Sequence, residues 1–310
     1  MEDEGKKSVN WEKDIVEKLT FAAITEQRRA RRWRVFFVSL FFVYLFTVPF
    51  IFSGSFEVPE VEKGGRHTAL VDLEGIISSE ADASADKVVT ALRDAFEDKD
   101  TAGVILRINS PGGSPVQSSY IYREIKRLRE KYPDVPLYSV ITDLCASGGY
   151  YVAVGADKIY ANESSIVGSI GVIMNGFGFE GAIKKLGIER RALTAGEHKA
   201  LLDPFAPMQE TEKKHLQIML DDIHQQFIAT VKEGRGDKLA QDESLFSGLV
   251  WTGEKAKELG LIDDFGSAGY VAREVIGEED IVDFTTKKDF LSRLSEQMGV
   301  SIANSLSRIW

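Results

Sequence analysis

The sequence predicts an α/β domain with a largely parallel sheet, preceded by one transmembrane helix. Three observations predict this organisation. Short β-branched runs alternate with segments of helical periodicity along most of the chain, which is the pattern of strands connected by helices. Shortly after one predicted strand, 137–142, comes a serine, Ser147, followed by two glycines. An uncharged apolar stretch, Val35 to Ser53, precedes all of these elements.

The stretch from Val35 to Ser53 has the length of a membrane span. At about 1.5 Å per residue, its 19 residues would extend about 28 Å, close to the ~30 Å hydrocarbon core of a bilayer. Five arginines lie between Arg28 and Arg34 and acidic residues follow the stretch, so the positive-inside rule predicts a cytoplasmic segment 1–34. A cleaved signal peptide is the alternative, although its apolar part is normally shorter and ends at an A-x-A-like site. Residues 54–66 are expected to form a linker to a domain outside the cytoplasm.

The composition narrows the function classes. The net charge of −10 argues against a surface that binds nucleic acid. The single cysteine, Cys145, excludes an intramolecular disulfide framework. We therefore expect no nucleic-acid partner, and we predict neither a cofactor nor a bound metal.

The elements of the domain are expected in the following order. Predicted strands cover 67–77, 137–142, 157–161 and 169–174, where β-branched and apolar residues run together, and 102–114 is predicted as a buried strand that runs into a glycine turn. Predicted helices cover 84–96, 118–132, a short segment from Ser147, 209–232 and 254–263, where apolar residues recur at helical spacing. In the tail, residues 277–310, four apolar residues at four-residue intervals predict an amphipathic helix or an arm for a partner subunit: Leu294, Met298, Ile302 and Leu306.

Ser147 is the candidate nucleophile. It lies between a predicted strand and a predicted helix, where unpaired backbone N–H groups and the helix dipole favour developing negative charge. Gly148 and Gly149 let the backbone come close to the group that the hydroxyl attacks. The alternative is that Ser147 only caps the helix and the glycines only allow close packing. Cys145 is a rival nucleophile, although a buried free cysteine is usually a small hydrophobic residue.

The motif INSPGGS, Ile108 to Ser114, lies at the end of another predicted strand. In an open α/β sheet its amides can face the same crevice as Ser147, because ligands bind outside the carboxyl ends of the strands. Such a turn can donate a backbone N–H to an oxyanion, with the N–H of Gly148 as the second donor. The alternative is an ordinary Pro-Gly turn.

A nucleophilic serine also needs a base. The segment Thr194 to Phe205 holds both His198 and Lys199. A lysine can act as a base where burial favours its neutral amine, so the residues alone leave both candidates open. The remaining histidines are expected on the surface: His67, His215 and His224.

Four motifs in this order resemble the signal peptide peptidase A family: NSPGG, ASGGYYVA, VGSIGVIM and the segment around Lys199. The resemblance covers His67 to Ile276. It implies a Clp-protease/crotonase-like fold of repeated β-β-α units, in which Ser147 is the nucleophile and Lys199 is the general base. It also implies that Ser169 orients the lysine and that Gly113, together with Gly148, offers the oxyanion amides.

The resemblance further implies a membrane-anchored bacterial serine protease of the single-domain kind. Its domain would lie outside the cytoplasmic membrane, in the periplasm of a Gram-negative cell, and its substrates would be remnant signal peptides or misfolded membrane-associated polypeptides. Soluble Clp-type proteases place a histidine soon after the nucleophile, and SIVGSIGVIMNG contains none, which favours a Ser–Lys dyad. A homo-oligomeric ring in which neighbours share each site is expected. The alternatives are a crotonase-like acyl-CoA enzyme and a non-catalytic membrane-tethered scaffold.

Overall fold

The computed structural model describes residues 2–52 and 65–286. The chain divides into two compact units. The first contains the helix α1, and the second, residues 64–288, contains the sheet and all the other elements.

The helix α1 runs without interruption from Glu2 to Phe52. Thr20 and Thr25 each donate a side-chain hydrogen bond to the carbonyl four residues earlier, as threonines in helices commonly do. The predicted membrane span lies at the end of α1, except for Ser53, which is outside the described residues. None of the helices in the described ranges reaches the length and mean hydropathy needed to cross a bilayer. The transmembrane helix is therefore not confirmed and stays a prediction.

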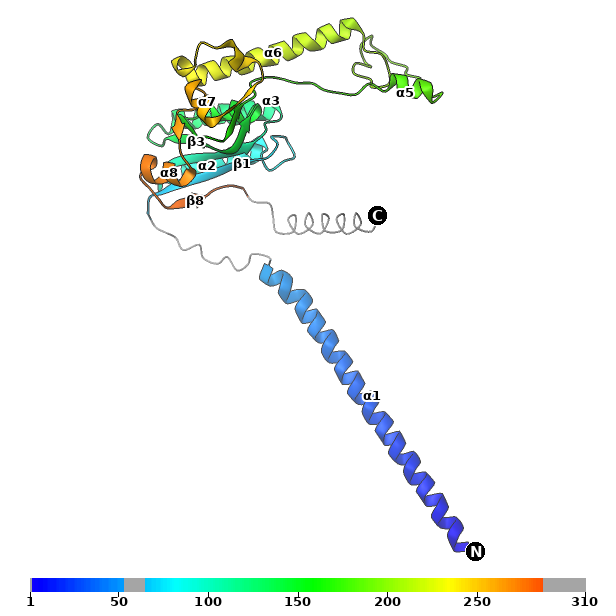
Figure 1. The fold of residues 1–310 in the computed structure, drawn as a ribbon. Helices are drawn as coiled ribbons and strands as arrows, with labels where there is room; N and C mark the ends of the chain where they lie inside the picture. The colour runs from blue at the N-terminus through cyan, green and yellow to red at the C-terminus, as the bar shows by residue number, and fades with distance from the viewer. Residues whose placement is uncertain (1, 53–64, 287–310) are drawn as a thin grey trace. The chain divides into compact units, whose positions relative to one another are not determined.

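The second unit is built on a mixed sheet, so the predicted α/β class is confirmed (Figure 1). Its centre is parallel: β1 (His67–Glu74), β2 (Thr101–Ser110) and β3 (Leu137–Ala146) pair side by side. The helices α2 (Ala85–Glu97) and α3 (Pro115–Lys131) connect them. All three strands therefore end at the same edge of the sheet, and the turns that follow β2 and β3 lie next to each other.

The strand β3 divides the rest of the sheet into two branches. Its first half pairs with β4 (Lys158–Ala161) and its last residues pair with β5 (Ile166–Gly168). Shorter strands complete the edges: β6 (Val250–Thr252) beside β5, β7 (Asp264–Phe265) beside β4, and β8 (Ile281–Asp283) beside β1. Since β8 belongs to the segment 277–310, the sheet continues past Ile276; residues 287–310, with the predicted amphipathic helix, lie outside the described residues.

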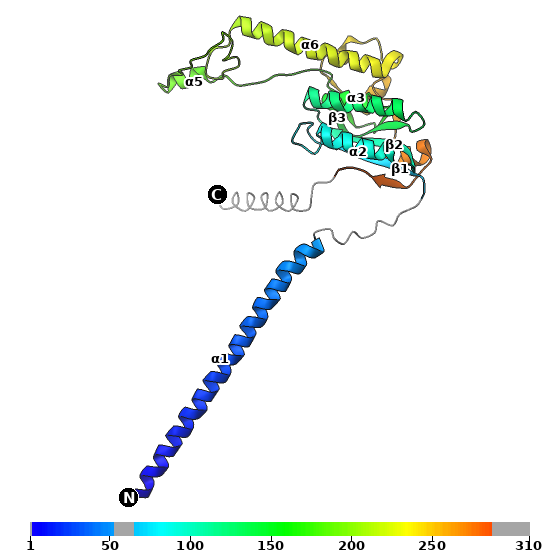
Figure 2. The ribbon, with the colours of Figure 1, turned by 180° about the vertical axis from the view of Figure 1, so that it is seen from behind.

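Successive side chains of a strand point to opposite faces of the sheet, so the apolar ones form a core on each face. In β1, Ala69, Val71 and Leu73 join the large cluster under α2 and α3, whereas Leu70 joins a smaller cluster on the other face. The smaller cluster is covered by α8 (Ala268–Tyr270) and the π-helical turn Val271–Ile276. Figures 1 and 2 show α2 and α3 side by side on one face of the sheet.

The remaining helices come after β3 in the chain. They are α4 (Gly148–Ala153), α5 (Glu180–Lys185), the long α6 (Glu210–Arg235) and α7 (Gly253–Glu258), with short 3-10 turns at Gly236–Lys238 and Glu243–Phe246. The helix α6 packs on the domain through buried residues near its C-terminal end, among them Phe227 and Val231.

Two local predictions were wrong. Residues 169–174 were predicted as a strand, but the strand is β5, Ile166–Gly168, and residues 169–174 have no regular secondary structure. Apolar sequence predicts an extended chain, but only a neighbouring strand makes it part of a sheet. The repeat is also simpler than β-β-α, because β1, β2 and β3 are each followed by one helix. Instead of a second strand, the structure has one isolated parallel β-bridge, between Ile77 and Gly113.

Between β5 and α6 the chain leaves the body of the domain. We call residues 172–209 the arm; Figures 1 and 2 show its helix α5 well away from α3 and β3. The arm is held by internal contacts, including the ring pair of Phe179 and Phe205 and the ion pair of Arg190 and Asp203. It nevertheless exposes large apolar side chains, and Phe177 is 82% exposed. Such exposure is typical of a surface that another molecule covers.

Candidate active site

The backbone at Ser147 is strained. Its φ of 51° and ψ of −122° lie outside the regions that a residue with a Cβ normally adopts. The strain costs on the order of 1–3 kcal/mol and is typical of functional sites. Two hydrogen bonds hold the turn: Ser147 N–H donates to the carbonyl of Gly168, and Tyr151 N–H donates to the carbonyl of Ser147, each at 2.9 Å.

The hydroxyl of Ser147 makes no capping hydrogen bond to α4. The helix-capping alternative therefore does not apply, and the half-buried hydroxyl is available for chemistry. Its position between the end of β3 and the start of α4 agrees with the strand–turn–helix geometry that the sequence predicts.

The turns after β2 and β3 touch through their glycines. A Cβ added to Gly112 would lie 2.5 Å from the nitrogen of Gly148, and one added to Gly148 would lie 3.2 Å from the nitrogen of Gly113. Gly112 and Gly113 also have φ values of 93° and 152°, which side chains rarely allow. Only glycines let the two turns come this close, and they bring the N–H groups of Gly113 and Gly148 to one place beside Ser147.

The N–H groups of Gly113 and Gly148 donate no backbone hydrogen bond within the described residues. In the described residues, two backbone hydrogen bonds connect this turn to the chain after β1. The N–H of Ile77 donates to the carbonyl of Gly112 at 2.9 Å, and the N–H of Ser114 donates to the carbonyl of Ile77 at 2.8 Å. The N–H groups of Gly113 and Gly148 are not among the donors of these bonds. Two adjacent free amides next to a hydroxyl can stabilise the oxyanion of a tetrahedral intermediate.

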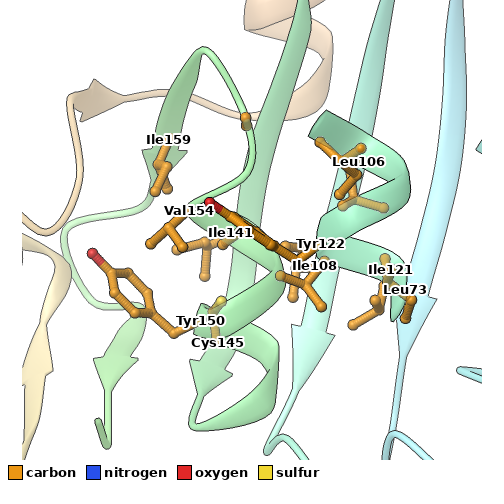
Figure 3. Close-up of a cluster of buried hydrophobic side chains, with 14 of the residues drawn as sticks. Leu73, Leu106, Ile108, Ile121, Tyr122, Ile141, Cys145, Tyr150, Val154 and Ile159 are labelled. Carbon is orange, nitrogen blue, oxygen red and sulfur yellow. The ribbon is translucent and has the colours of Figure 1, made fainter. Parts of the chain in front are cut away.

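Cys145 is excluded as the rival nucleophile. It is fully buried in the core, and Figure 3 shows it beside Tyr150 within that cluster. Burial raises the pKa of its thiol far above the usual range, so the reactive thiolate does not form.

Ser169 lies one residue beyond the Gly168 carbonyl that binds Ser147. It has a φ of 53°, and its N–H donates to the carbonyl of Leu249 at 2.7 Å. The side chain is half-buried. Ser169 is therefore adjacent to the candidate nucleophile, at the point where the chain leaves β5 toward the arm.

A cleft of about 470 Å³ opens beside Ser147. Gly113, Ser147 and Gly148 line it. Its walls come from the first turns of α3, from Gly171 to Ile173, and from the middle of α6, including Phe227. The walls are mostly apolar, which suits an extended peptide whose side chains are partly apolar.

Lys199 does not line this cleft. It is exposed on the arm, in a hollow formed with Arg190, Arg191 and Asp203. The structure thus brings Ser147, Gly113, Gly148 and Ser169 together but keeps the predicted base apart from them.

The histidines do not supply an alternative base within the cleft. His198 is exposed on the arm beside Lys199. His67 is buried at the start of β1, at the opposite end of that strand from the candidate site, so the surface prediction was wrong for it. His224 is half-buried in α6, with Nε2 3.2 Å from the carbonyl of Ile170.

The sequence did not predict the contribution of α6 to this site. Residues 209–232 were predicted only as a helix with apolar residues at helical spacing, yet Phe227 lines the cleft together with Ile223 and Gln226. The signal was the helical periodicity of this segment, which indicates a buried face but not what the face covers.

The fold and the site define a class: a hydrolase with a mixed α/β domain, a serine on a strained turn and two free amides beside it. Residues 129–281 match the model of peptidase family S49. A putative signal peptide peptidase SppA of Enterococcus faecium is 31% identical over 268 residues, which are 82% of this chain and 77% of that protein. Protease 4 of Haemophilus influenzae is 34% identical over 203 residues, 64% of this chain and 32% of that protein.

Proteins of Brucella abortus and Brucella melitensis named Na(+)/H(+) antiporter NhaA are each 46% identical over 188 residues, 61% of this chain. The chain spans only a quarter of their length, 25%. The chain belongs to peptidase family S49. It thus carries a serine-protease domain of that family, as the motifs predicted.

Proposed function

We propose that the chain is a serine endopeptidase in which Ser147 is the nucleophile and Lys199 of a neighbouring copy is the general base. The observation that carries the proposal is the arrangement at the end of β3. A strained, uncapped serine lies there beside the free N–H groups of Gly113 and Gly148. Membership of a serine-peptidase family supports the same reaction.

In the proposed mechanism, the peptide lies in the cleft with its scissile carbonyl at Ser147. The base takes the hydroxyl proton as Oγ attacks the carbonyl carbon, and the N–H groups of Gly113 and Gly148 bind the oxyanion. The base then gives its proton to the leaving amine. Water, activated by the same base, hydrolyses the acyl-enzyme, and Ser169 orients the lysine amine through its hydroxyl.

The position of Lys199 supports a site shared between chains. A lysine acts as a base only where its surroundings favour the neutral amine, and that requires removal from water. In the single chain Lys199 is exposed on an arm that leaves the domain. A second copy would bury the apolar side chains of the arm and bring Lys199 to a neighbour's Ser147. A closed ring of identical chains would repeat this contact.

Membrane attachment and substrates are part of the proposal. The uncharged stretch from Val35 and the arginines before it support a single-pass anchor in a bacterial cytoplasmic membrane, with the protease domain on the outer face. The name of the Enterococcus relative supports cleaved signal peptides as substrates, and misfolded membrane-associated polypeptides are a second class to test.

The proposal is tested by mixing inactive subunits. Ser147→Ala and Lys199→Ala chains, each with its own tag, are co-expressed in equal amounts and purified through both tags, and peptide hydrolysis is measured. In a ring with shared sites, a Lys199→Ala chain next to a Ser147→Ala chain forms an intact site, so random mixing restores about one quarter of the wild-type activity. A dyad within one chain restores none.

A matched mixture gives an independent answer. Wild-type chains are mixed equally with the doubly substituted chain, which carries Ser147→Ala and Lys199→Ala. Shared sites then retain about one quarter of the full activity, whereas sites within one chain retain about one half. Full activity of homogeneous Ser147→Ala protein would show that another residue is the nucleophile.

A further inference from the structure

Arg123 differs from the other basic residues of α3. Four of these are paired with carboxylates: Lys126 with Glu233, Arg127 with Glu124, Arg129 with Asp157, and Lys131 with Glu97. Arg123 is exposed and has no carboxylate partner within the described part of the chain. Its position on the helix explains the difference, since it lies on the face of α3 that lines the Ser147 cleft.

The charge that lines the cleft is positive only, among the described residues. Val116, Ser119, Tyr120 and Arg123 line it from one face of α3, at the spacing that places residues of a helix on the same side. Among the described residues that line the cleft, Arg123 is the only charged one. A cation without a carboxylate, beside mostly apolar walls, attracts an anionic group of whatever lies in the cleft.

The position of Arg123 sets which part of a peptide it can reach. Ser114, next to the candidate oxyanion amide of Gly113, is the N-cap of α3, and Arg123 is nine residues further on. At about 1.5 Å per residue this is about 13 Å along the helix axis, and helical side chains lean back toward the N-terminus. An extended peptide advances about 3.3 Å per residue, so the guanidinium reaches groups roughly two to four residues from the scissile bond.

We propose that Arg123 is a specificity-determining residue that binds a carboxylate of the peptide substrate two to four residues from the cleaved bond. The planar guanidinium can bind a carboxylate through two parallel hydrogen bonds, which makes it selective for that group. The carboxylate can be an Asp or Glu side chain or the C-terminus of a short peptide. This inference rests on the proposed peptidase activity and specifies its substrates.

A carboxylate of a neighbouring chain is the competing partner. The arm carries acidic residues, such as Glu189 and Glu197, and in an assembly one of them could pair with Arg123. Arg123 would then stabilise the assembly rather than select the substrate. The two roles differ in the experiment, because a substrate contact changes the ratio between matched peptides, whereas an assembly contact changes all peptides alike.

The test uses internally quenched peptides with one scissile bond and blocked ends. Glu is compared with the isosteric Gln at each position from two to four residues on both sides of that bond. A second pair compares a free C-terminal carboxylate with its amide at the same distances. For wild-type full-length protein at low salt, we expect one position at which the carboxylate raises kcat/KM about tenfold, an effect that falls as NaCl rises.

In Arg123→Gln the carboxylate-to-neutral ratio at that position should fall to about one. In Arg123→Glu the preference should turn to Lys over Gln at the same position. The matched control is Lys126→Gln, which removes the same charge from the same helix outside the cleft lining and should keep the wild-type ratio. Which of the two peptide pairs responds identifies the source of the carboxylate.

Three outcomes would overturn the inference. Wild-type protein could cleave carboxylate and neutral peptides equally at every position. The ratio could persist in Arg123→Gln, or that variant could lose assembly in light scattering while all peptides slow alike. Failure of the wild-type protein to cleave any of the peptides, neutral ones included, would instead refute the proposed peptidase function, so the two failures are distinguishable.

Discussion

Replacing Gly112 by alanine tests whether the close contact of the two glycine turns builds the site. Gly112 is buried, and its φ of 93° is unfavourable for alanine. The added Cβ would lie 2.5 Å from the nitrogen of Gly148, 2.7 Å from the carbonyl oxygen of Ala146 and 2.8 Å from Cβ of Ser147. All these neighbours belong to the turn that holds the nucleophile, and two of them are backbone atoms that cannot rotate away.

These distances set the size of the expected loss of activity and stability in Gly112→Ala. Ordinary contact begins at 3.4 Å, so the nitrogen of Gly148 must move by about 0.9 Å to relieve a distance of 2.5 Å. A displacement of about 1 Å at a reacting group costs about 100-fold in rate, and loss of one oxyanion donor costs about 100- to 1,000-fold. For stability, the left-handed backbone costs about 1–2 kcal/mol and overpacking about 1–3 kcal/mol, so Gly112→Ala should lower the free energy of unfolding by about 2–5 kcal/mol.

Gly75→Ala is the matched control. Gly75 has a similar φ of 82°, but a Cβ there would meet no atom within 4 Å. This variant should lose only about 1–2 kcal/mol and keep its activity. Urea unfolding at fixed protein concentration and peptide hydrolysis by the full chain measure both effects. With a slope of about 2 kcal/mol per M, the midpoint should fall by roughly 1–2.5 M for Gly112→Ala. Equal midpoints and equal rates for the two variants would refute the reasoning.

Three further predictions follow from the same geometry. Ser147→Gly should abolish hydrolysis yet raise the free energy of unfolding by about 1 kcal/mol, because glycine adopts a φ of 51° without strain; unchanged or lower stability would contradict the strain at this turn. Lys199→Arg should be inactive because guanidinium does not give up its proton, whereas His198→Ala should keep most activity and wild-type kcat/KM should rise toward alkaline pH; the opposite pattern would assign the base to His198. Hydrogen bonds from Arg127 and Arg93 lower the pKa of the Glu124 carboxyl to about 2, although burial by itself would raise it. Glu124 therefore contributes stability above about pH 4.5, and this contribution is lost as pH falls toward 2. The free energies of unfolding measured by urea at pH 7 and pH 3 should therefore differ by about 1–2 kcal/mol less in Glu124→Gln than in wild type, a value reduced because both guanidinium groups are half-exposed.

The sequence by itself determined the class of the domain and the place of the nucleophile. The β-branched runs became β1, β2 and β3, and the helical segments between them became α2 and α3. Ser147 followed directly from the order of strand, serine and two glycines. These features are local, because periodicity and turn chemistry act within a few residues, and they are therefore readable along the chain.

Only the tertiary structure decided which residues meet. Cys145 and Ser147 are two positions apart, yet packing buries one in the core and leaves the other in the cleft. The free amide of Gly113 lies beside that of Gly148 because β2 and β3 are parallel neighbours. Lys199 lies away from Ser147, and Arg123 has no carboxylate partner in the described residues, because elements distant in sequence set their surroundings. Such contacts depend on how whole elements pack, and no local pattern of residues encodes them.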